Sequence, residues 1–109
     1  PNAVRGLVKA INRGMAECIR DPAGSVSAMT AVEPLLNIDL ERQRMLLSLR
    51  RHIITREALE VGAGDISPAR MTTNIDVIAA EYQLPRKPSV DEVFNRSFLP
   101  PIADRKFSI

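Results

Sequence analysis

Hydrophobic residues recur with a helical period over the first 20 residues of the chain. At 100° per residue they fall on one arc of a helix, and charged residues occupy the opposite side. The apolar residues are Val4, Leu7, Val8, Ile11, Met15, Cys18 and Ile19. We therefore expect an amphipathic helix from Ala3 to Arg20. Asp21 and Pro22 then supply an N-cap and a first-turn proline, which predict a second helix from Pro22 to about Val32.

The third predicted helix runs from Asp39, its expected N-cap, to about Ile54 and carries a large apolar surface. Its hydrophobic residues cover more than half of the circumference: Leu40, Met45, Leu46, Leu47, Leu49, Ile53 and Ile54. A helix this apolar is usually covered on more than one side. We therefore expect it to pack against another body, either the rest of a larger protein or a second copy of the chain.

Glycines and caps divide the middle of the chain. Residues 55–59 predict a short capped turn, and Gly62-Ala63-Gly64 ends it, because glycine accepts the left-handed conformations that stop helices. Ser67-Pro68 predicts the start of another helix, which extends to about Gln83. This helix is striped by Met71, Ile75, Ile78 and Tyr82.

Beyond Leu84 the chain is rich in proline, at positions 85, 88, 100 and 101. Proline interrupts helices, so this region has room for one short helix, from Ser89 to about Asn95. We expect residues 85–109 to form a tail that wraps over the surface, anchored by Phe94, Phe98 and Leu99. No segment alternates as a β-strand does. The sequence therefore predicts an all-α fold of four to five helices, with residues 1–109 forming a single helical unit.

The composition excludes several classes of function. The chain has 109 residues, 45% of them hydrophobic and 26% charged, which suits one small folded unit. A single cysteine, Cys18, and a single histidine, His52, exclude an internal disulfide, a thiolate-rich zinc site and a multi-histidine metal site. No run reaches the roughly 18 apolar residues of a membrane span. We predict no metal, no cofactor and no membrane span.

The chemically capable residues lack the neighbours that catalysis requires. Gly62-Ala63-Gly64 follows a helical turn, whereas a phosphate-binding loop follows a strand. His52 lies near a helix end, where a cation suits the dipole, and Cys18 lies on an apolar face, where a thiol is unreactive. Asp91 and Glu92 are adjacent, which suits the first turn of a helix better than an acid–base pair facing across a cleft. We predict that the protein is not an enzyme and has no catalytic residue.

The charge pattern does not favour nucleic-acid binding. The net charge of +2 is nearly balanced, although the isoelectric point is about 9.2. A basic stripe lies on the outer face of the first helix and is formed by Arg5, Lys9, Arg13 and Arg20. Glu17 interrupts this stripe, and no aromatic residues are interleaved with it. Surfaces that bind nucleic acid usually combine basic residues with interleaved aromatic residues. We expect a solvated or ion-paired face and no nucleic-acid partner.

The order of these segments resembles one protein family. Residues 3–14 followed by Asp21-Pro22 are similar to an element of the periplasmic substrate-binding proteins that serve nitrate, sulfonate, taurine and thiamine-pyrimidine ABC transporters. The family continues with a leucine-rich helix and then with an Ile-Thr-Arg-Glu-Ala-like turn, a Gly-x-Gly and a capped helix, which correspond here to residues 54–58, 62–64 and 67–71. It closes with segments like 84–88, 93–95 and 98–101. The resemblance lies in the order and spacing, which cover nearly the whole chain.

The resemblance implies that the chain is the C-terminal helical third of a two-lobed α/β protein. In that parent it would complete one lobe without taking part in catalysis. The ligand-holding loops and both sheets would lie upstream, so no ligand-binding residue can be assigned in this chain. The implied partners are a small organic or anionic solute and an ABC permease. The implied location is the periplasm, with the signal peptide outside this chain.

Two other functions stay open. The chain could be a stand-alone helical module that self-associates through the third helix, or a fragment of an enzyme from the branch that makes the thiamine pyrimidine. That branch uses a lysine-held cofactor and a sacrificial histidine, and His52 does not lie in such a motif. The N-terminus has no signal-peptide pattern, so we expect a mature or cytosolic protein or an internal start. As an isolated chain we expect a homo-oligomer.

Overall fold

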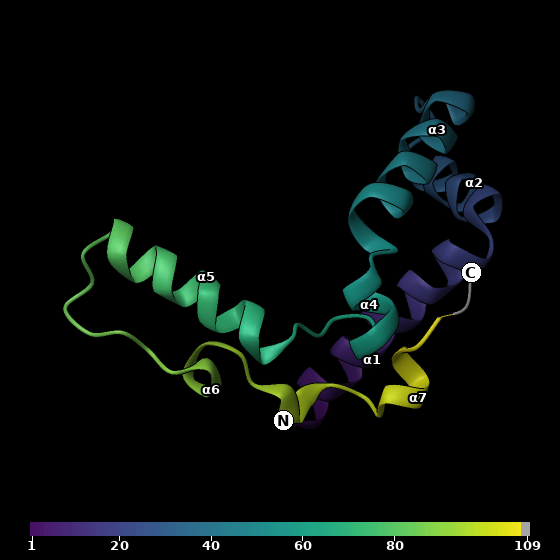
Figure 1. Ribbon diagram of the computed structural model, residues 1–109. Helices are drawn as coiled ribbons and strands as arrows, with labels where there is room; N and C mark the ends of the chain where they lie inside the picture. Colours follow the sequence, from purple (N-terminus) through teal and green to yellow (C-terminus); the bar gives the residue numbers. More distant parts are fainter. Residues whose placement is uncertain (108–109) are drawn as a thin grey trace.

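The computed structural model describes residues 1–107, and every regular element within them is helical. Helices account for 72% of this part of the chain, which confirms the all-α prediction. Figure 1 shows two arms that diverge from a base formed by α1 (Asn2–Arg20) and α4 (Arg56–Val61). The first helix begins at Asn2, one residue before the predicted Ala3, and ends at Arg20 as predicted.

The first arm consists of α2 (Pro22–Val32) and α3 (Ile38–Ser48), which pack against each other. Asp21 caps α2 as predicted, because its carboxylate accepts a hydrogen bond from the backbone N–H of Gly24 at 2.9 Å. The second arm consists of α5 (Pro68–Glu81) and α6 (Val90–Val93), which also pack against each other. Figure 1 shows this second arm reaching away from the rest of the chain.

The third helix starts two residues earlier than predicted and has a different cap. Asn37 is the N-cap, and its side-chain oxygen accepts from the backbone N–H of Leu40 at 3.0 Å. The prediction of Asp39 as N-cap is therefore wrong. Asp39 lies in the first turn, where its negative charge suits the positive end of the helix dipole. After Ser48 the helix continues as a π-helical segment, Leu49–Ile53.

The segment between α4 and α5 follows the predicted turn chemistry. Thr55 caps α4 by accepting from the backbone N–H of Ala58 at 3.1 Å. Gly62 and Gly64 have φ angles of +86° and +75°, which confirms that the two glycines end this helix. Ser67 caps α5 as predicted. That helix ends two residues early because Gln83, at φ 48°, turns the chain out of the helical conformation.

The C-terminal tail contains more helix than the sequence predicts. The helix expected over 89–95 is the single turn α6, and a 3₁₀ turn (Arg96–Phe98) follows it. A further helix, α7 (Ile102–Arg105), begins directly after Pro101. The described residues thus contain seven α-helices, and the expected count of four to five is too low. Proline interrupts a helix, but a helix can begin directly after it, and Pro101 is the N-cap residue of α7.

The molecule is open and has a small core. Its buried hydrophobic residues are Val26, Leu49, Ala63 and Ile75. The Cα radius of gyration is 16.9 Å, whereas a compact chain of this length has about 13 Å. The accessible surface is 8044 Å², and a compact monomer of this mass exposes about 6,000 Å². The excess is about 2,000 Å², and large hydrophobic side chains on both arms and on α1 are among the exposed residues.

None of the helices within residues 1–107 combines the length and the apolar character that crossing a membrane requires.

Candidate functional site

The loop Gly62–Gly64 is the point where two segments distant in sequence, α1 and the tail, meet. Ala63 donates its backbone N–H to the carbonyl of Arg105 at 2.9 Å. A Cβ atom on Gly62 would lie 3.1 Å from the Arg105 side chain, and one on Gly64 would lie 3.1 Å from Oδ1 of Asn12. The glycines therefore do more than end a helix, because they also allow the tail and α1 to approach the backbone closely.

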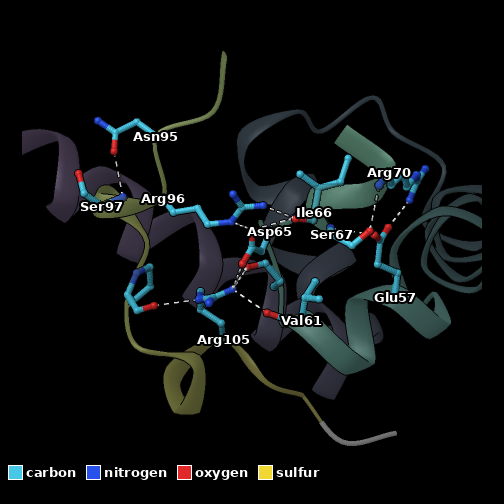
Figure 2. A network of polar contacts seen from close by, with 12 residues as sticks. Glu57, Val61, Asp65, Ile66, Ser67, Arg70, Asn95, Arg96, Ser97 and Arg105 are labelled. Carbon is cyan, nitrogen blue, oxygen red and sulfur yellow. Dashed lines mark hydrogen bonds and ion pairs between the residues drawn. The ribbon is translucent and has the colours of Figure 1, made fainter. Parts of the chain in front are cut away.

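Arg105 holds the tail to this loop. Its side chain is only 9% exposed. Nε donates to the carbonyl of Pro100 at 2.8 Å, and Nη1 donates to the carbonyl of Val61 at 2.9 Å. Nη1 also lies 3.6 Å from Oδ2 of Asp65. Figure 2 shows these contacts converging on one guanidinium group, which satisfies a buried charge with carbonyls and a carboxylate.

A second tail arginine binds the other oxygen of the same carboxylate. Arg96 donates Nε to Oδ1 of Asp65 at 3.0 Å and Nη2 to the carbonyl of Ile66 at 2.5 Å. Its guanidinium carbon lies 5.2 Å from the centroid of the Phe94 ring. We call Asp65, Arg96 and Arg105 the arginine junction. Because both arginines come from the tail, Asp65 ties residues 96 and 105 to the loop between α4 and α5 (Figure 2).

A further polar contact joins α4 to the start of α5. Glu57 accepts the backbone N–H of Ser67 at 2.9 Å, and its other carboxylate oxygen pairs with Arg70. Figure 2 shows this contact on the α5 side of the arginine junction. The hydrogen bonds from Ser67, together with Arg70, lower the pKa of Glu57 from 4.5 to about 2. The carboxylate is therefore ionised over the whole ordinary pH range.

Two hollows flank the Gly62–Gly64 loop. The first is polar, has a volume of about 250 Å³ and is lined by side chains that include His52, Thr55, Glu57 and Arg70. Glu57 and Arg70 already bind each other there. The second is an apolar groove of about 290 Å³ on the α1 side of the loop. It is lined by Val8, Ile11, Asn12, Met15, Ala63, Gly64 and Leu99. We call this second hollow the α1 groove.

The structure separates the residues that the sequence suggested for chemistry. His52 lies in the π-helical segment, is exposed and lines the polar hollow. Cys18 is a free, half-buried thiol on α1 and does not line that hollow. Within residues 1–107 no group of three or more histidine, cysteine or acidic side chains is placed to hold a metal. The arrangement of His52 and Cys18 thus offers no catalytic pair.

Asp91 and Glu92 have the structural role that the sequence predicted. Both lie in the first turn of α6. Glu92 also forms a capping box with Ser89, accepting its backbone N–H at 2.7 Å, and it accepts from Nη1 of Arg86 at 3.0 Å. These contacts lower the pKa of Glu92 to about 2. The hydrogen bond from Arg86 has the largest effect, and the hydrogen bonds from Ser89 lower the pKa further.

The basic stripe of α1 is exposed, as expected. Arg20 is ion-paired with Glu17. Arg5 also contacts the tail: it donates Nη1 to the carbonyl of Ser97 at 3.0 Å and its guanidinium carbon lies 5.5 Å from the centroid of the Phe98 ring. Arg5 therefore binds the tail while it still faces solvent.

Sequence reasoning missed Asn12, Asp65, Arg96 and Arg105. Asn12 is buried, at 6% exposure, and the three charged residues form the junction. Their contacts join positions 30 to 44 residues apart, so no local period or cap marks them. The only available signal was the presence of arginines in a proline-rich tail.

No family model, no curated protein and no solved structure matches this chain.

Proposed function

We propose that the chain is the C-terminal helical portion of a periplasmic solute-binding protein of an ABC uptake system. Its role is to complete one lobe of that protein, and it performs no catalysis. The order of segments along the chain, from residues 3–14 to residues 98–101, supports this assignment because it resembles the corresponding part of the nitrate, sulfonate, taurine and thiamine-pyrimidine binding proteins.

The observation that carries the proposal is the uncovered apolar surface of the first arm. Large hydrophobic side chains on α2, α3 and their connection are between 39% and 94% exposed. They are Met29, Val32, Leu35, Ile38, Leu40 and Leu47. A monomeric protein rarely leaves so many apolar side chains together on one surface. In a complete lobe this surface packs against the sheet, as helices do in layered α/β proteins.

In the parent protein, ligand binding closes the two lobes about a hinge, and the closed form docks on the permease. The present chain contributes rigidity to one lobe. The arginine junction supports this role because it fixes the tail, the Gly62–Gly64 loop and the start of α5 in one arrangement. The solute is a small organic or anionic molecule held by residues outside this chain.

Cysteine labelling tests where Leu47 lies in the longer gene product. In a Cys18→Ser background, Leu47→Cys reacts readily with a maleimide in the isolated chain, since Leu47 is 57% exposed. In the longer product the same cysteine is protected if the first arm packs on the lobe. Arg56→Cys is the matched control, because that side chain is 94% exposed and reacts in both proteins. Equal labelling of Leu47→Cys in the two proteins would contradict the proposal.

Ligand screening tests the non-binding role of this part. Nitrate, taurine and an aminopyrimidine should raise the melting temperature of the longer product if one of them is its solute, because a ligand stabilises the state it binds. The isolated chain should show no shift with any of the three. A clear shift in the isolated chain would place a solute site within these residues and overturn the assignment.

A further inference from the structure

The α1 groove differs chemically from the rest of the exposed apolar surface because it contains a buried amide. Apolar side chains and glycine backbone form most of its lining, and Asn12 is its only side chain with hydrogen-bonding capacity. Asn12 is 94% buried, and its Nδ2 donates to the carbonyl of Val8 at 3.0 Å. A pocket of this kind selects an apolar group that carries a matching polar atom.

The oxygen of that amide has no donor. Within residues 1–107 no side chain or backbone N–H donates to Oδ1 of Asn12. No fully buried side-chain polar atom in this part lacks a partner, so Oδ1 keeps some accessible surface, and Asn12 lines the groove. The groove also has no charged residue in its lining. Its complement is therefore a neutral, largely apolar group with one N–H or O–H donor, such as an indole or a phenol.

The chain itself contains one side chain with that chemistry. It has no tryptophan and a single tyrosine, Tyr82. Tyr82 lies at the C-terminal end of α5, at the tip of the second arm, and is 76% exposed. Ile78 and Leu84 beside it are 52% and 42% exposed. The arm thus presents an apolar patch with one phenolic O–H, and it reaches away from the body of its own chain (Figure 1).

We propose that two copies of this chain associate by exchanging their second arms, with Tyr82 of each copy inserted into the α1 groove of the other. The phenolic O–H then donates to Oδ1 of Asn12, and Ile78 and Leu84 cover the exposed Leu7 and Ile11 beside the groove. The contact is isologous, so each groove and each arm is used once and the assembly closes as a dimer.

The excess surface of the whole chain, both arms included, is larger than one such dimer interface requires. A stable interface of standard size buries about 800 Å² on each partner. The chain exposes about 2,000 Å² more than a compact monomer of its mass. Arm exchange uses α1 and α5 and leaves the first arm free, so it is independent of the lobe contact proposed above. It also differs from the third-helix interface that the sequence suggested.

Analytical ultracentrifugation of matched variants tests the contact. The natural chain should sediment as a monomer–dimer equilibrium. Tyr82→Phe removes only the hydroxyl and should raise the dimer Kd by about fivefold for each of two contacts, or about 30-fold in all. Tyr82→Ser should abolish the dimer. Leu35→Ser is the control, because Leu35 is 94% exposed on the first arm and should leave the equilibrium unchanged.

A double-mutant cycle identifies the acceptor. Asn12→Leu removes Oδ1 while keeping the side-chain size, and Tyr82→Phe should then have no further effect on the Kd. A natural chain that stays monomeric at all accessible concentrations would overturn the proposal. So would a dimer whose Kd is the same for the natural chain and Tyr82→Phe, since it would use another surface. Either result leaves the labelling test of the lobe contact unaffected.

Discussion

At the scale of single residues, the position of the Arg105 side chain depends on the absence of a side chain at Gly62. The positive φ of Gly62 is costly for any other residue, and the absence of a Cβ leaves room for the Arg105 side chain. The guanidinium group of Arg105 and the turn residues Gly62 and Ala63 are all buried where the tail meets this loop. Substitutions at these two positions therefore test how tightly the tail is bound.

Replacing Gly62 by alanine should destabilise the fold by about 1–3 kcal/mol, because the new Cβ is strained by the positive φ and lies close to Arg105. Gly14→Ala is the matched control. Gly14 lies within α1 with no atom near its Cβ position, so alanine there should stabilise by about 0.5–1 kcal/mol through helix propensity. Urea unfolding measures both values. A Gly62→Ala protein as stable as the natural chain would contradict the close approach.

Arg105→Met keeps the apolar stem of the side chain and removes its hydrogen bonds. We expect a loss of about 2–3 kcal/mol, because the carbonyls of Val61 and Pro100 lose a charged donor in a buried setting. Arg56→Met is the control. The Arg56 side chain pairs with Glu60 but is 94% exposed, so its loss should change stability by less than about 0.5 kcal/mol. Equal effects of the two substitutions in urea unfolding would show that Arg105 does not hold the tail.

At the scale of elements, the junction between α4 and α5 depends on an ionised carboxylate. The pKa of Glu57 falls from 4.5 to about 2 on folding, so the folded state binds this proton less well than the unfolded state. The stabilisation is complete above pH 4.5 and is lost as the pH falls toward 2. The second arm, which Glu57 helps to orient, should then loosen.

We expect the unfolding free energy to decline between pH 4.5 and 2, and Glu57→Gln should have a shallower decline. Glu92 has the same lowered pKa, so a residual slope should persist in that variant and diminish when Glu92→Gln is added. Denaturant titrations at several pH values measure these slopes. An unchanged slope in Glu57→Gln would show that this carboxylate does not contribute.

The helices that carry local signals were predictable from the sequence. Asp21, Thr55, Ser67 and Ser89 each cap the helix that follows, and these caps depend on residues within one turn. The π-helical end of the third helix and α7 were not predicted, because neither has a side-chain cap that marks its start. The candidate site was also missed, since Arg105 and Val61 are 44 residues apart.

At the scale of the whole molecule, openness is the property that most needs an explanation. Two arms diverge from α1 and α4, and only four hydrophobic residues are buried in the part of the chain that the structure describes. A free energy of folding depends chiefly on apolar burial, so a chain this open is stabilised further by any body that covers its faces. The lobe of a parent protein covers the first arm in our account, and a second copy covers the α1 groove.

The most direct test of the central claim is the reading frame immediately upstream of Pro1 in the gene. Our account predicts that the frame continues and encodes two α/β lobes preceded by a signal peptide, with this chain as the C-terminal portion. A start codon directly before Pro1 would contradict it.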